Sequence, residues 1–100
     1  MSGATIYLDD DTCTIFKDGE LKGQVKYAPH QRQIFRSFRE AEDTLKSLAG
    51  FLSRRMLIRP KVEIVVKRKL RGGMTDMDAR ILSEAAAAAG FRQCTVVADG

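Results

Sequence analysis

The sequence predicts one α/β domain, residues 1–100, with a mixed five-stranded β-sheet and two helices. Short β-branched and aromatic segments come first, and apolar residues then recur at helical spacing. The stretch from Arg59 to Val97 reads as a strand, a helix and a second strand, which implies a parallel crossover connection. Because ligands of such sheets usually meet the carboxyl edge of the strands, we expect the functional site there.

Three antiparallel strands are expected at the start of the chain. Residues 4–9 and 12–17 are β-branched and aromatic segments separated by acidic turn residues. Asp18-Gly19 is typical of a tight hairpin turn, and a third strand, 21–27, follows it. We expect this third strand at an edge of the sheet, where charged side chains guard against pairing with another chain; those charges are Lys22 and Lys26.

A long amphipathic helix is expected over residues 31–55. Apolar residues recur there at alternating spacings of four and three, at Ile34, Phe38, Ala41, Leu45, Leu48 and Leu52. Pro29 ends the preceding strands, and Pro60 precedes the fourth strand, 61–66. The opposite face carries mixed acidic and basic residues, which is typical of a solvated surface. The apolar stripe is therefore expected to pack on the sheet.

A second helix is expected to begin after Thr75, whose hydroxyl can cap the first turn. Asp76 and Asp78 follow at positions where the helix dipole favours negative charge. The predicted buried stripe consists of Met77, Ile81, Ala85 and Ala88. Gly90 supplies a left-handed stop, and Phe91 is placed to pack back on the last turn before the final strand.

Composition favours a cytoplasmic globular domain. No apolar run approaches the roughly 20 residues needed to cross a bilayer, and the first residues lack the basic flank and apolar segment of an export signal. The net charge of +4, from 17 basic and 13 acidic residues, is only a mild basic excess and gives weak support to nucleic-acid binding. Cys13 and Cys94 are interpreted as reduced thiols on non-neighbouring strands, and no metal or cofactor is expected.

Several motifs carry a family resemblance. Arg59-Pro60 precedes the fourth strand, a Gly-Met-Thr turn ending at Thr75 precedes the second helix, and that helix closes on Ala89-Gly90. Together with residues 41–46 and Glu84-Ala85, these motifs resemble the first subdomain of MreB-type bacterial actins. The resemblance covers nearly all of this chain but only part of such a protein. It implies a ribonuclease-H-like, actin-like βββαβαβ fold with sheet order 3-2-1-4-5 and an antiparallel second strand.

Two departures from that family argue against nucleotide hydrolysis. The family's first hairpin holds a phosphate loop, Asp-Leu-Gly-Thr-x-x-Thr, but this chain reads Leu8-Asp9-Asp10-Asp11-Thr12-Cys13-Thr14. Aligned on Thr14, the family's glycine falls on Asp10, so a carboxylate would meet the phosphate. The second departure is an insertion, residues 67–70, after the fourth strand. We therefore expect a protein that is not an enzyme.

The turn after the fourth strand is the strongest candidate site. Its basic residues lie at the expected ligand edge and are followed by two glycines and a helix N-terminus, an arrangement that suits a phosphate or an acidic peptide. The candidate anion-binding or partner-binding residues are Lys67, Arg68, Lys69, Arg71, Gly72, Gly73 and Thr75. Aromatic residues that would stack on bases are not interleaved with these charges, so nucleic acid is the less favoured ligand.

The leading hypothesis is a non-catalytic actin-like subdomain that acts by protein–protein contact, with an MreB-type cytoskeletal protein or by self-association. The alternative is a small anion-binding or nucleic-acid-binding protein that uses the basic turn at 67–71. A third hypothesis, a degenerate two-metal nuclease, would need Asp9 to Asp11 together with Glu40 or Glu42, but Lys67 to Lys69 stand where a third carboxylate is required. His30 lacks a nucleophile beside it in sequence, so catalysis there is not expected.

Overall fold

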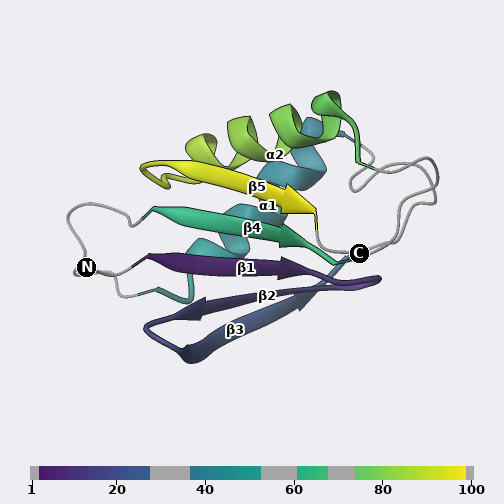
Figure 1. The fold of residues 1–100 in the computed structure, drawn as a ribbon. Coiled ribbons are helices and arrows are strands. Elements are labelled where there is room, and N and C mark those ends of the chain that lie inside the picture. Colours follow the sequence, from purple (N-terminus) through teal and green to yellow (C-terminus); the bar gives the residue numbers. More distant parts are fainter. Residues whose placement is uncertain (1–2, 28–36, 53–60, 68–73, 99–100) are drawn as a thin grey trace.

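The computed structural model describes residues 3–27, 37–52, 61–67 and 74–98. Along these residues the secondary structure follows the expected order of three strands, helix, strand, helix and strand (Figure 1). The elements are β1 (Ala4–Leu8), β2 (Thr12–Lys17), β3 (Glu20–Lys26), α1 (Phe38–Ala49), β4 (Val62–Val66), α2 (Asp76–Ala88) and β5 (Cys94–Ala98).

The strands form one mixed sheet in the order β3-β2-β1-β4-β5. β2 runs antiparallel to both β1 and β3, whereas β4 runs parallel to both β1 and β5. In this register Ile6 lies between Ile15 on one side and Ile64 on the other. The predicted five-stranded order, with its antiparallel second strand, is confirmed. The carboxyl ends of β1, β4 and β5 consequently meet at one edge.

The turn between β2 and β3 has the predicted hairpin chemistry. Asp18 has φ 55° and Gly19 has φ 79°, so both central residues occupy the left-handed region that a type I′ turn requires. Aspartate tolerates this region and glycine adopts it freely, which explains why this dipeptide reverses the chain here. The ladder shifts register between Ile15 and Phe16, which places a bulge on the edge pair of strands.

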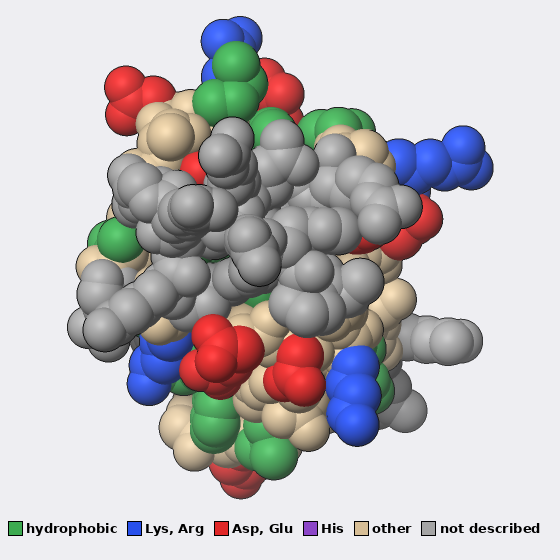
Figure 2. Space-filling model, turned by 90° about the vertical axis from the view of Figure 1, so that its right-hand side faces the viewer, with side chains coloured by type: hydrophobic (Ala, Val, Ile, Leu, Met, Phe, Trp, Pro, Cys, Tyr) green, Lys and Arg blue, Asp and Glu red, His purple; other side chains and the backbone are tan. Residues whose placement is uncertain are grey.

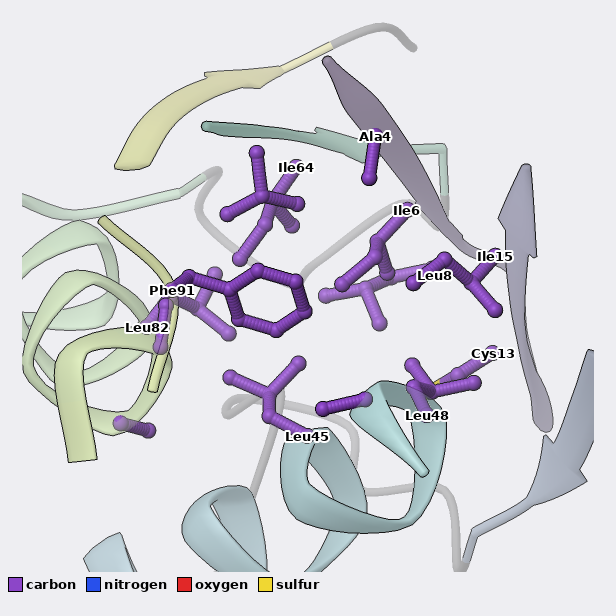
Figure 3. Packing of buried hydrophobic residues seen from close by; sticks show 14 of the residues in the cluster. Ala4, Ile6, Leu8, Cys13, Ile15, Leu45, Leu48, Ile64, Leu82 and Phe91 are labelled. Carbon is purple, nitrogen blue, oxygen red and sulfur yellow. The ribbon is translucent and has the colours of Figure 1, made fainter. Parts of the chain in front are cut away.

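Both helices lie on the same face of the sheet (Figure 1). Alternate residues of β1, Ala4, Ile6 and Leu8, point to that face and are buried. They meet Leu45 and Leu48 of α1 as well as Leu82 of α2 and Phe91 (Figure 3). The core is thus a two-layer sandwich of helices on a sheet.

The helix α1 is shorter than the predicted 31–55. Ser37 has extended backbone and its hydroxyl accepts from the N–H of Glu40, so the helix begins after Ser37; Gly50 caps its end. The predicted stripe is confirmed at Ala41, Leu45, Leu48 and Leu52, which are buried. It is wrong at Phe38, which is 40% exposed because it occupies the first turn, at the helix end. Ile34 lies outside the described residues.

The helix α2 begins at the predicted cap, Thr75, but its buried stripe differs from the prediction. Met77 is 64% exposed and Ala88 is also exposed; Ile81 is partly buried against the core and Ala85 is fully buried. The buried residues are Asp78, Leu82, Ala85 and Ala86. The stripe is displaced because Asp78 turns back toward Thr75, which puts a capping carboxylate on the inner face.

The end of α2 follows the prediction. Gly90 has φ 101°, and its N–H donates to the carbonyl of Ala87 while the N–H of Phe91 donates to that of Ala86. This pair of hydrogen bonds is a Schellman motif, which requires a left-handed residue and therefore favours glycine. Phe91 is buried against the core, as expected.

No disulfide joins the two cysteines: Cys13 lies on β2 and Cys94 on β5, with β1 and β4 between these strands. This confirms the predicted separation. Neither helix in the described ranges is long and apolar enough to span a bilayer.

Candidate functional site

The face of the sheet opposite the two helices carries a ladder of side chains from every strand. Because paired residues share a face, the register assigns Thr14, Tyr7, Val65 and Val97 to one row across β2, β1, β4 and β5. We call this surface the outer face. Its described strand members are Thr5, Tyr7, Thr12, Thr14, Phe16, Leu21, Gln24, Lys26, Glu63, Val65, Thr95 and Val97. Within the described part of the chain, no helix packs on it.

The centre of the outer face is apolar. Val65 is only 8% exposed because it lies between Tyr7 on β1 and Val97 on β5. The rings of Tyr7 and Phe16 meet edge to face, with centroids 5.6 Å apart and an interplanar angle of 86°. Aromatic pairs of this kind contribute about 0.5–1.5 kcal/mol beyond their buried area. Leu21, opposite Phe16, leaves a further apolar side chain 60% exposed at the β3 edge.

Lys67 lies over the outer face. Its ammonium is 4.7 Å from the centroid of the Tyr7 ring, a cation–π contact, and its backbone N–H donates to the carbonyl of Leu8 at 2.9 Å. The first predicted site residue therefore belongs to the same surface as Tyr7. Five other predicted site residues lie outside the described residues: Arg68, Lys69, Arg71, Gly72 and Gly73.

Thr75, the last predicted site residue, closes a capping box with Asp78. The Thr75 backbone N–H and hydroxyl each donate to Oδ2 of Asp78 at 3.0 Å, and the Asp78 N–H donates to the Thr75 hydroxyl at 3.2 Å. Asp78 is almost buried, and Asp76 adds a second carboxylate to the same turn. An incoming anion would meet this negative charge, so the start of α2 is a poor phosphate site.

The aspartates between β1 and β2 are exposed and form a turn held by backbone contacts. The Asp9 N–H donates to the carbonyl of Thr12, the Tyr27 hydroxyl donates to the carbonyl of Asp9, and the Tyr27 N–H donates to that of Asp11. Asp10 is also exposed. The connection between β1 and β2 is thus an exposed acidic turn.

The carboxylates proposed for the nuclease hypothesis do not form a metal centre in the described residues. Glu42 pairs with Lys46 at 3.5 Å on α1, and Glu40 lies in the first turn of the same helix. Across the described ranges, no three His, Cys, Asp or Glu side chains are grouped to hold a metal ion. Acidic and basic side chains are both present on the end of the molecule shown in Figure 2. His30 lies outside the described residues.

The thiol of Cys94 is partly buried on β5. Burial raises its pKa above the ordinary value, and a hydrogen bond with Ser83 opposes this in part. The neutral thiol is thus favoured, and such a thiol is a poor nucleophile.

The outer face was missed by the sequence reasoning, although a signal for it exists. In β1 and β2 the polar and aromatic residues Thr5, Tyr7, Thr14 and Phe16 alternate with buried ones. The two helices belong to consecutive crossover connections that meet at β4, and right-handed crossovers place both helices on the same face of the sheet. These four residues are then expected on the opposite face.

No family model matches the chain, and no curated protein matches it. The resemblance to MreB-type actins therefore stays a prediction.

Proposed function

We propose that the protein is a non-catalytic interaction module, related to the first subdomain of bacterial actins, that binds a protein partner through the outer face of its sheet. The observation that carries the proposal is this face itself, which presents Tyr7, Phe16 and Leu21 from three adjacent strands. Aromatic side chains are enriched at protein interfaces, and the paired rings of Tyr7 and Phe16 provide two of them on this face.

The strand order supports the actin-like part of the proposal. A mixed sheet in the order β3-β2-β1-β4-β5, with the second strand antiparallel, is the arrangement that the resemblance implies. The acidic turn at Asp9 to Asp11 supports the non-catalytic part, since exposed carboxylates replace the glycine-containing loop that approaches phosphate. The partner we propose is an actin-like cytoskeletal protein.

Anion binding at residues 67–71 is the less favoured function. Lys67 is engaged with the Tyr7 ring, and the adjacent helix start carries Asp76 and Asp78. Binding that depends on the basic turn would weaken steeply with salt, whereas an apolar interface would not.

The test is co-sedimentation of the protein with purified MreB-type filaments. Leu21→Asp places a charge on the outer face, and Met77→Asp places the same charge on α2 on the other side of the sheet. The two residues are similarly exposed, 60% and 64%, so each substitution should spare the fold. We expect Leu21→Asp to weaken binding at least about tenfold, or about 1.4 kcal/mol, and Met77→Asp to leave it unchanged. Equal effects of the two substitutions, or ATP hydrolysis by the purified protein, would contradict the proposal.

A further inference from the structure

The two edges of the sheet differ in their protection against pairing. The edge strand β3 carries Lys22 and Lys26, adjoins a bulge, and contains a salt bridge between Lys22 and Glu20 at 2.9 Å. The edge strand β5, with the sequence Cys-Thr-Val-Val-Ala, contains neither a charge nor a proline. Natural proteins usually blunt exposed edges with such residues, so an apolar edge without them is a site for adding a strand.

The backbone groups that β5 offers can be assigned from its pairing with β4. The Val62 N–H donates to the carbonyl of Gln93 at 2.8 Å, and Val62 lies opposite Cys94. Because alternate residues of a strand direct their N–H and C=O to the same side, Thr95 and Val97 bond toward β4. Cys94, Val96 and Ala98 therefore direct theirs away from the sheet. Among the described elements, β5 has only β4 as a strand neighbour.

These outward groups are self-complementary about a two-fold axis. If a second β5 runs antiparallel and centred on Val96, Val96 of each copy faces the other, and Cys94 faces Ala98 on both sides. All three pairs are then of the hydrogen-bonded type, in which both residues exchange N–H···O=C bonds. Thr95 lies opposite Val97 on the outer face, so no like charges oppose each other in this register.

We infer that the partner at the β5 edge is a second copy of this chain, which joins two sheets into one across a two-fold axis at Val96. This inference rests on the proposed function as an interaction module but uses a different surface. An isologous pairing needs one segment that is both donor and acceptor, and β5 meets that requirement. The outer faces of the two copies would then form one continuous surface.

Cysteine cross-linking tests the register. In a background where Cys94 is changed to Ser, Val96→Cys would place two thiols across the axis, with Cα atoms about 5.5 Å apart in a hydrogen-bonded pair. This separation is compatible with a disulfide, which needs about 4.4–6.8 Å. Ala98→Cys in the same background is the control, because its copies would lie four residues apart along the strand, roughly 13 Å. Restoring Cys94 in the Ala98→Cys variant should recover the cross-link.

We expect a covalent dimer on mild oxidation of the Val96→Cys variant, none with the Ala98→Cys control, and recovery when Cys94 is restored. Sedimentation of the unmodified protein should also show a dimer. Equal cross-linking of both cysteine variants, or a monomer at all concentrations, would overturn the inference. Leu21 lies at the opposite edge of the sheet from β5, on β3. The effect of Leu21→Asp on filament binding therefore does not depend on pairing through β5. If the protein is a monomer but Leu21→Asp still weakens filament binding, the inference of a dimer is refuted while the proposed function stands.

Discussion

The capping box at the start of α2 gives a prediction whose size can be worked out from the contacts. Asp78→Ala removes the acceptor of two hydrogen bonds, from the Thr75 N–H and hydroxyl, both at 3.0 Å. Hydrogen bonds to a charged group contribute about 1.5–3 kcal/mol, and a carboxylate near a helix start adds about 0.3–1 kcal/mol. Because Asp78 is only 8% exposed, water replaces these bonds poorly. We expect a loss of about 2–3 kcal/mol in the free energy of unfolding.

A double-mutant cycle checks the reasoning. Thr75→Ala removes the cap acceptor of the Asp78 N–H and should cost about 1 kcal/mol. Since the two side chains bond to each other, the double variant should cost less than the sum by at least about 0.5 kcal/mol. The assay is urea unfolding followed by circular dichroism. The slope of the free energy of unfolding against urea concentration should be the same in all variants. Additive losses, or a smaller loss for Asp78→Ala than for Thr75→Ala, would refute the account of this turn.

Three further predictions concern glycine positions and a thiol. Gly23→Ala should destabilise the protein by about 1–3 kcal/mol, because a Cβ there would overlap the ring of Phe51; combining it with Phe51→Ala should recover part of the loss, measured by urea unfolding. Gly90→Ala should cost about 1 kcal/mol or more, because φ is 101° there, and a thermal melt showing no change would contradict this. Burial raises the pKa of Cys94, so as pH rises the thiol loses its proton in the unfolded chain before it does so in the folded protein. The free energy of unfolding should therefore fall as pH rises past the ordinary thiol pKa, and Cys94→Ser should reduce this decline.

Most of the fold could be predicted because local and tertiary preferences agree. The strand residues alternate, the turn residues at Asp18 and Gly19 demand one turn type, and Gly90 requires a left-handed stop. These features depend on few neighbours and can be read from sequence. The order of strands followed from the single right-handed way of making the parallel crossover and from the resemblance.

The errors arise where a residue has a role that periodicity does not describe. Asp78 is buried because it caps its own helix, so the apolar stripe of α2 lies beside the one counted from Met77. Ser37 caps the start of α1, although the apolar pattern in the sequence begins before Ser37 and continues beyond it. The outer face was missed because its centre, Tyr7 and Val65, is assembled from β1 and β4, strands far apart in the sequence.

The most direct test of the outer face as the binding surface is a methyl NMR titration of the labelled protein with a purified MreB-type protein. Val65 and Val97 report on the outer face, whereas Leu45 and Leu82 report on the helix side of the sheet. We predict that the largest shifts or broadening occur at Val65 and Val97, with little change at the two leucines. Changes confined to the leucines, or no change at saturating partner, would contradict binding through the outer face.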